Sequence, residues 1–198
     1  MKRIIIDTET TGFNPPAAGI VEVAAVVLDD GTLTTAFTEI CNPGLSALSG
    51  SGVDTALSIS GIKRSEISAA KPSADVAKRL REWIRLNALG APIHAFNVDF
   101  DARFLNATPW SFPADRWSEC VMLAASEVMG QAGALPQFSN GKYKWPKLSE
   151  AAKFFGVDQR NAHRALGDAQ CAAAIYRNIL DRREAKAFQT KTSETVPE

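Results

Sequence analysis

Long apolar runs with short polar interruptions dominate the first forty residues of the chain. β-Branched residues fill positions 4–6, and a near-continuous apolar run covers residues 20–28. Such runs are typical of strands that are buried on both faces. Residues 29–31 form an Asp-Asp-Gly hairpin signal, and the alternation over 32–41 predicts the returning strand. The chain is therefore expected to begin with an antiparallel hairpin.

The pattern changes to a helical period further along the chain. Residues 42–61 are rich in Gly and Ser and predict a surface loop or a short helical turn. Pro72-Ser73 opens a helix that ends near Gly90. Its apolar stripe consists of Val76, Leu80, Trp83, Ile84 and Leu89. A short strand is expected over 91–96, a helix starting within 97–105, and a fifth short strand over 117–122 that continues into a helix through residue 129.

The last third of the chain predicts two helices and a tail. Residues 131–147 form a polar loop that contains aromatic side chains, and 148–155 predict a short helix ended by Gly156. A long helix is expected over 163–183. From residue 187 polar residues dominate, so 187–198 is expected to be a disordered tail behind a single domain, residues 1–186. The early hairpin followed by alternating strands and helices predicts a mixed α/β sheet flanked by helices.

Composition excludes several classes of protein without choosing a function. The 198 residues carry 22 Lys and Arg against 22 Asp and Glu, so the net charge gives no argument for or against a nucleic-acid partner. The three cysteines share no CxxC spacing, which argues against a disulfide framework or a zinc site. No signal peptide and no apolar run of 18 residues is visible. We expect a cytoplasmic protein without a membrane partner.

Two acidic residues directly follow the first apolar run. Asp7 and Glu9 are spaced i, i+2, so a strand would point both carboxylates to one face. Two neighbouring anions repel each other unless a cation lies between them. Carboxylate oxygens suit Mg²⁺ or Mn²⁺. Thr10, Thr11 and Gly12 then supply hydroxyls and a turn whose N–H groups can reach a ligand.

A second acidic pair lies at the start of the helix expected after residue 97. Asp99 and Asp101 are about 200° apart on a helix, so they cannot both face one site. Asp101 borders the inward face formed by Phe104 and Leu105. We therefore choose Asp101 for the site and interpret Asp99 as an acid that stabilises the helix start.

The third chemical cluster opens the last long helix. Asp168 shares a helix stripe with apolar residues only, and a carboxylate on an inward face needs a partner. His163 precedes that helix, where its side chain can reach over a site. Glu22 interrupts a buried strand; it could face the acids, but a hydrogen-bonded structural role is favoured. His94 is expected to be an ordinary hydrogen-bonded histidine.

Three motifs together resemble a known enzyme family. They are Asp7-x-Glu9-Thr-Thr-Gly12, Asn97-x-x-Phe100-Asp101-x-x-Phe104-Leu105 and His163-x-Ala165-x-x-Asp168-Ala169. In order and spacing they resemble the DEDDh 3′–5′ exonucleases, which include proofreading subunits, stand-alone exodeoxyribonucleases, ribonuclease T and oligoribonuclease. The resemblance spans residues 3 to about 180. It implies a fold similar to ribonuclease H.

The resemblance also implies a mechanism. Asp7, Glu9, Asp101 and Asp168 would hold two Mg²⁺ or Mn²⁺ ions, and His163 would be the general base. The product would be a nucleoside 5′-monophosphate released from a 3′ end. For Phe104, core packing is favoured over base stacking. The implied substrate-binding residues are Thr10, Thr11, Gly12, Phe13, Asn97 and Phe104.

The resemblance leaves the substrate open. Phe96 stands where members often carry His, and residues 59–62 lack a histidine that some members have nearby. Single-stranded DNA is favoured by analogy, RNA is the enzymatic alternative, and a nucleic-acid or polymerase-binding module is the non-enzyme alternative. A polymerase or another replication or repair protein is a candidate partner. Candidate stacking and cationic contacts to a single strand are Phe13, Tyr143, Trp145, Lys142, Lys144 and Arg164.

Overall fold

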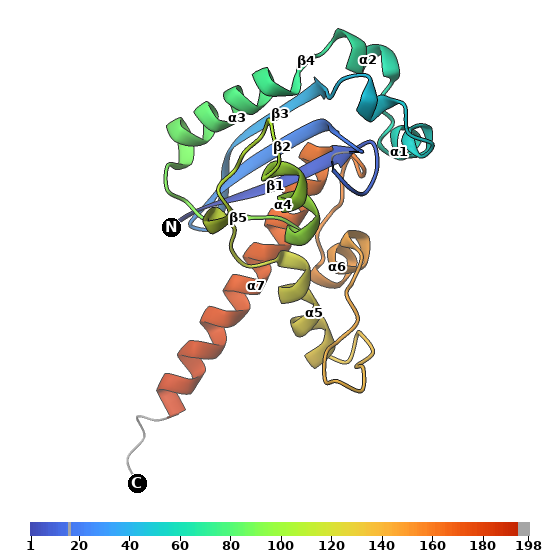
Figure 1. Ribbon diagram of the computed structural model, residues 1–198. Helices are drawn as coiled ribbons and strands as arrows, with labels where there is room; N and C mark the ends of the chain where they lie inside the picture. The colour runs from blue at the N-terminus through green and yellow to red at the C-terminus, as the bar shows by residue number, and fades with distance from the viewer. Residues whose placement is uncertain (16, 194–198) are drawn as a thin grey trace.

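A single mixed sheet organises the part of the chain that the structure, a computed structural model, describes: residues 1–15 and 17–193. The strand order is β4-β3-β2-β1-β5 (Figure 1). The strands are β1 (Lys2–Thr10), β2 (Ile20–Asp29), β3 (Thr32–Asn42), β4 (Lys71–Pro72) and β5 (Ile93–His94). β1, β2 and β3 pair antiparallel, whereas β5 runs parallel to β1 and β4 parallel to β3. The predicted N-terminal hairpin and mixed sheet are confirmed.

Helices cover both faces of this sheet. They are α1 (Val53–Ser60), α2 (Arg64–Ala69), α3 (Ser73–Ala88), α4 (Val98–Leu105), α5 (Val121–Gln131), α6 (Leu148–Phe155) and α7 (Ala165–Ser193). Two short 3-10 turns, η1 (Ser46–Leu48) and η2 (Ala114–Arg116), lie in the connections. Figure 1 shows α3 on one face and α7 across the other, with α5 and α6 beside α7.

The side chains of β1 alternate between the two faces of the sheet. Ile4 and Ile6 are fully buried in the core beneath α3, and Ile5 is buried in the core formed with α5, α6 and α7. Successive side chains of a strand point to opposite faces. Asp7 therefore continues the face of Ile5, and Glu9 follows it on the side of α7.

The predicted fifth strand over 117–122 is wrong. Trp117 makes only an isolated bridge to Ile93, and the N–H of Val121 already bonds to the Ala95 carbonyl at the start of α5. The two-residue β5 offers too short an edge for a longer partner. The fifth strand is β4, which pairs with the end of β3. Pro72 lacks an N–H donor and suits such an edge position.

The segment over 42–61, for which the sequence predicts a surface loop or a short helical turn, contains an eight-residue helix. α1 occupies its second half and ends at Gly61, whose φ of 69° is the left-handed conformation that closes many helices. Val53 and Leu57 are buried against Val21 of β2 in a third apolar cluster. α2 follows and was not predicted. This pair of short helices lies at the end of the sheet where β1 ends, close to Asp7 and Glu9 in the sequence of the strand (Figure 1).

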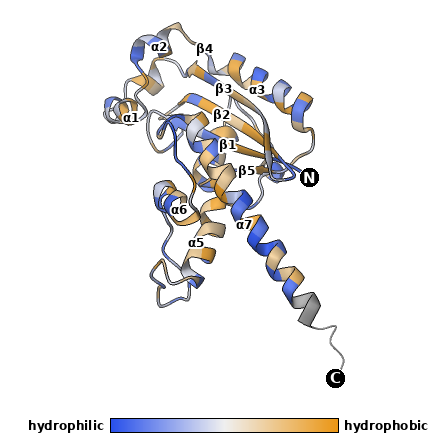
Figure 2. Ribbon diagram, turned by 180° about the vertical axis from the view of Figure 1, so that it is seen from behind, coloured by the Kyte–Doolittle hydropathy of each residue, from blue (hydrophilic) through white to orange (hydrophobic). Residues whose placement is uncertain are grey.

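The last helix extends beyond its predicted end at residue 183. α7 continues to Ser193, so the expected tail is helical over residues 187–193, and its remainder, 194–198, lies outside the described residues. Glu184, Ala185, Lys186 and Ala187 all favour helix, and they continue the helix without burial. Figures 1 and 2 show this mainly hydrophilic part projecting away from the sheet. No helix in the described ranges has the length and apolarity needed to cross a membrane.

Candidate active site

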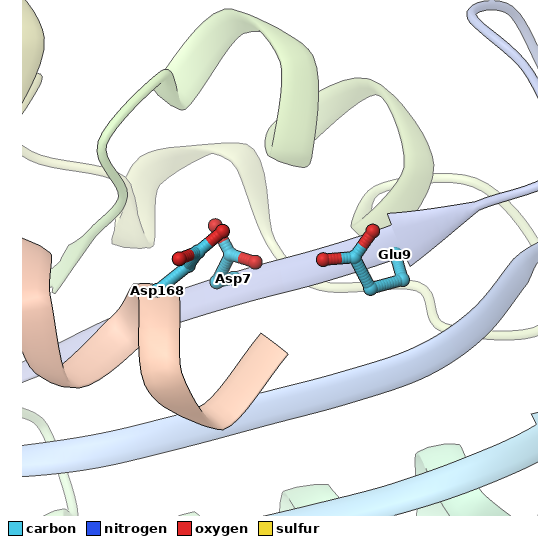
Figure 3. Close-up of side chains that lie close together, drawn as sticks. All are labelled: Asp7, Glu9 and Asp168. Carbon is cyan, nitrogen blue, oxygen red and sulfur yellow. The ribbon is translucent and has the colours of Figure 1, made fainter. Parts of the chain in front are cut away.

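Three carboxylates from two distant segments meet at the end of β1. Oxygen atoms of Asp7, Glu9 and Asp168 all lie within 4.8 Å of one another. Figure 3 shows Asp7 and Glu9 on the same side of β1, with Asp168 reaching them from the first turn of α7. The sequence prediction that these acids share one site agrees with this geometry.

Burial and mutual repulsion make the cluster costly without a cation. Burial raises the pKa of Asp7 well above its ordinary value, and the charges of Asp101, Glu9 and Asp168 raise it further. Burial, followed by the charges of Asp168 and Glu22, raises the pKa of Glu9 from 4.5 to about 7, against a lowering effect of Arg164. Both causes disfavour the anionic forms. Carboxylates in this arrangement fit a hard divalent cation, which would remove the repulsion.

Asp101 lies next to this trio without belonging to it. Its side chain is buried, and its Oδ1 accepts a hydrogen bond of 2.8 Å from the Thr8 hydroxyl. Burial raises its pKa to about 7, although the Thr8 hydrogen bond lowers it. Among neighbouring charges, Asp101 has the largest effect on the pKa of Asp7. Asp99 in the same helix is exposed, as expected for an acid at a helix start.

The loop before α7 holds Asp168 and presents His163. Asp168 accepts hydrogen bonds from the Gln159 amide (3.1 Å) and from the backbone N–H of His163 (3.3 Å). Burial nevertheless raises the pKa of Asp168. His163 has a φ of 62°, and its imidazole is exposed at the rim of the site. The loop passes so close to α7 that a Cβ at Gly167 would lie 2.5 Å from the Arg160 carbonyl oxygen.

An ion pair between the buried Glu22 and the partly exposed Arg164 fixes this loop to the sheet. Glu22 of β2 is 3% exposed and accepts hydrogen bonds from Arg164 Nε (3.0 Å) and Nη2 (2.6 Å). The N–H of Ala165, the first residue of α7, donates a third bond of 3.0 Å. Glu22 thus has the structural role that the sequence favours. The Arg164 guanidinium, a candidate nucleic-acid contact, is instead paired with Glu22, a contact across 142 positions that no local pattern reveals.

The residues of the Thr-Thr-Gly turn mainly hold the turn together. Thr10 donates its hydroxyl to the Gly12 carbonyl (2.7 Å), and Thr11 accepts a bond from the Gly19 N–H (2.9 Å). Phe13 is 80% exposed. The Thr11 N–H also donates to the Gly19 carbonyl (2.9 Å), so both hydroxyls and part of the backbone are used within the turn.

A cavity of about 400 Å³ opens beside Glu9. Phe13 and Gly12 line it from the turn, and α1 contributes Ile59 from a segment that the sequence predicts only as loop or turn. Phe100 of α4 completes the apolar wall. Phe100 and Ile59 were not predicted for the site, although the spacing of Phe100 in the second motif was a usable signal.

The remaining candidate residues divide between the interior and the surface of the protein. Phe104 is 3% exposed within the core beneath α3, which agrees with the packing role that the sequence favours. Asn97 is exposed at the start of α4, where its carbonyl accepts the N–H groups of Phe100 and Asp101. His94 is buried, with Nδ1 2.9 Å from the Glu119 carbonyl, and its position matches the ordinary role expected for it.

Curated relatives of the chain are mostly much longer proteins. The chain is 27% identical over 188 residues to the "DNA polymerase III PolC-type" of Bacillus subtilis, covering 94% of this chain and 12% of that protein. It is 28% identical over 184 residues to the "3′-5′ exonuclease DinG" of the same organism, covering 90% and 18%. For the "DNA polymerase III subunit epsilon" of Aquifex aeolicus, the identity is 24% over 181 residues, covering 90% and 80%. The chain thus spans about a tenth of the PolC-type polymerases.

Solved structures share the fold at low identity. The nuclease domain of 3′hExo, described as a DEDDh family member bound to rAMP, superposes with a TM-score of 0.67 at 21% identity, covering 91% of this chain and 92% of that one. E. coli Exonuclease I in complex with a dT13 oligonucleotide gives a TM-score of 0.71 at 20% identity, covering 96% and 43%. These likenesses confirm the expected ribonuclease H-like arrangement.

The family assignment comes from the sequence as a whole. The model of the RNase_T family, described as "Exonuclease", matches residues 4–176. That range includes all three motifs, the four acids and His163, so the motif interpretation and the family match cover the same part of the chain. The chain belongs to the RNase_T exonuclease family.

Proposed function

We propose that this protein is a metal-dependent 3′–5′ exonuclease that removes nucleoside 5′-monophosphates from single-stranded DNA, with residues 1–186 as one catalytic domain. The observation that carries the proposal is the convergence of Asp7, Glu9 and Asp168 within 4.8 Å, with Asp101 beside them. Such an array of anions with raised pKa values is typical of a functional site. The curated relative named a 3′-5′ exonuclease supports the direction of cleavage.

The four acids provide the ligands that two Mg²⁺ or Mn²⁺ ions need. Bound there, the ions would supply Lewis-acid stabilisation of the attacking and leaving oxygens at the scissile phosphate. Asp7 lies centrally, since the charges of the other three acids all act on it. Thr8 orients Asp101 through its hydrogen bond, and Gln159 orients Asp168.

His163 provides a proton acceptor at the rim of the cluster. A positioned general base contributes on the order of 10²–10⁴-fold in rate. Its backbone is held by the bond to Asp168, and the next residue is held by Glu22. No hydrogen bond of the His163 ring is found within residues 1–15 and 17–193, so the exposed ring can approach a water at the phosphate.

The cavity beside Glu9 suits the terminal nucleoside. Phe13, Ile59 and Phe100 give it apolar walls for a base, while the backbone of the Thr-Thr-Gly turn lies at its edge for the terminal hydroxyl. The names of the polymerase relatives favour DNA over RNA. They also make a polymerase or another replication or repair protein the candidate partner.

The decisive experiment compares end-labelled single strands of DNA and RNA with free or blocked 3′ ends. With Mg²⁺, stepwise release of mononucleotides from free DNA ends is expected, and a 3′ block should prevent it fully. The Asp7→Ala variant should release no mononucleotides. Faster release from RNA would replace DNA by RNA as substrate. Binding without turnover, even with Mn²⁺, would show a binding module and refute the enzymatic role.

A further inference from the structure

A short hairpin with an isolated antiparallel bridge between Gln137 and Tyr143 lies in the segment 131–147, from the end of α5 to the start of α6. The Phe138 N–H donates to the Lys142 carbonyl (2.7 Å), and the Lys144 N–H donates to the Pro136 carbonyl (3.0 Å). An Asn140-Gly141 turn, with Gly141 at a φ of 80°, closes it. The sequence predicts this segment only as a loop. We call it the 131–147 hairpin.

The 131–147 hairpin is fixed to α5 rather than loosely attached. The Tyr143 ring packs directly on Gly130, and a Cβ at that position would overlap the ring. The Ser126 hydroxyl donates to the Lys144 carbonyl at 3.0 Å. Both contacts come from α5, so the hairpin presents its outer side chains in a defined arrangement.

Those outer side chains are aromatic and cationic. Phe138 is 54% exposed and Trp145 is 58% exposed. The charged residues of the segment are Lys142, Lys144 and Lys147, with no Asp or Glu, in a chain whose net charge is zero. Lys144 pairs with Glu150 of α6, whereas no ion pair of Lys142 is found among the described residues. Exposed aromatic rings beside a local excess of positive charge match the bases and phosphates of a single strand.

The hairpin stands on the same side of the sheet as the acids. α5 begins at the end of β5, next to α4, and carries the hairpin at its other end, about 16 Å further along at 1.5 Å per residue. From the hairpin the chain returns through α6 to the loop that presents His163 (Figure 1). A strand leaving the acidic cluster along α5 and α6 would reach the hairpin after several nucleotides.

We propose that the 131–147 hairpin is a second contact for the single-stranded substrate, binding nucleotides several positions upstream of the 3′ end. Trp145 and Phe138 stack on bases, and Lys142 neutralises a phosphate. This inference rests on the proposed exonuclease function. It adds that substrate length, and not only the terminal nucleotide, determines affinity.

The test compares long and short substrates in matched variants. Trp145→Ala should raise KM about tenfold for a strand of roughly 20 nucleotides, the loss expected for one stacked base, without changing kcat/KM for a dinucleotide. Trp145→Phe should restore most of the affinity. Lys142→Ala should reduce the slope of log affinity against log salt by about 0.7. Leu86→Ala, which removes an exposed apolar side chain from α3, should change neither KM for the long strand nor kcat/KM for the dinucleotide.

Two results would overturn the proposal. Equal losses on the long strand and the dinucleotide would show that the hairpin only supports the active site. No loss on either would show that Trp145 does not contact the substrate, which also refutes the proposal. Fluorescence anisotropy of labelled long and short strands with wild type and Trp145→Ala in chelator measures binding without cleavage and so separates the two proposals. A length-dependent difference in binding there, together with no turnover in Mg²⁺ or Mn²⁺, would refute the exonuclease function and keep the hairpin.

Discussion

Replacing Glu9 by Gln should stabilise the metal-free protein while it abolishes activity. The pKa of Glu9 is raised from 4.5 to about 7 because burial and the charges of Asp168 and Glu22 disfavour its carboxylate. Gln has nearly the same shape and no charge to desolvate. No hydrogen bond to the Glu9 side chain is found in residues 1–15 and 17–193, so the change removes no such contact.

The size of the effect follows from the two pKa values. The folded protein binds the Glu9 proton more tightly than the unfolded chain, so stability falls as pH rises from about 4.5 through about 7 and then levels off. Between about pH 5 and about pH 8 this cost is at most about 2.5 kcal/mol. Since Asp168 can bind a proton in place of Glu9, we take about 1 kcal/mol as the lower bound.

The assay is thermal unfolding of wild type and Glu9→Gln in chelator at both pH values. For a chain of this length, about 1–2.5 kcal/mol corresponds to roughly 3–8 °C in Tm. The Tm difference between Glu9→Gln and wild type should therefore be larger at pH 8 than at pH 5 by that amount. Mn²⁺ should reverse the order at pH 8, because a ligand stabilises only the form that binds it. Asp115→Asn, at an exposed acid of η2, is the matched control and should show no pH-dependent gain.

The reasoning would be refuted if Glu9→Gln lost stability by the same amount at both pH values. That result would mean that the Glu9 carboxylate is satisfied by contacts within the folded protein. A cation would then not be needed to balance the cluster.

Three further predictions concern the elements around the site. Glu22→Gln should lower the free energy of unfolding in urea by about 1.5–3 kcal/mol, because Arg164 and the Ala165 N–H lose a charged acceptor; an unchanged value would show that the ion pair contributes little. Gly130→Ala should destabilise by about 1–3 kcal/mol through overlap with the Tyr143 ring, and calorimetry showing wild-type Tm would contradict this packing. His163→Ala should remove the ascending limb of the pH–rate profile, whereas a retained limb would assign the general base elsewhere.

Local patterns were sufficient to predict the acids because each one is specified by its immediate neighbours. The i, i+2 spacing of Asp7 and Glu9 needs only the extended conformation of β1, and the helical spacing around Asp168 needs only α7. The helical spacing also placed Phe104 in the core, where it is 3% exposed, so the substrate-binding role that the family resemblance implied for Phe104 is wrong. The antiparallel hairpin was equally local, because its turn and both strands are adjacent in sequence.

Features that depend on distant partners could not be predicted. Glu22 and Arg164 are 142 positions apart, so no periodicity links them. β4 consists of two residues that pair only because α2 brings them beside β3, and Ile59 joins the cavity beside Glu9 only because α1 packs at the end of β1. The extension of α7 to Ser193 was missed because a polar composition was interpreted as disorder, although Glu184 and the next three residues, with which the extension begins, favour helix.

The burial of β1 on both faces makes its length a fixed quantity. Deleting one of the three isoleucines Ile4 to Ile6 would move every later side chain of the strand to the opposite face of the sheet. Asp7 and Glu9 would then point into the apolar core beneath α3. Surface loops of this chain can gain or lose residues at little cost. β1 cannot, and insertions or deletions in homologous chains should therefore avoid the stretch from Ile4 to Glu9 altogether.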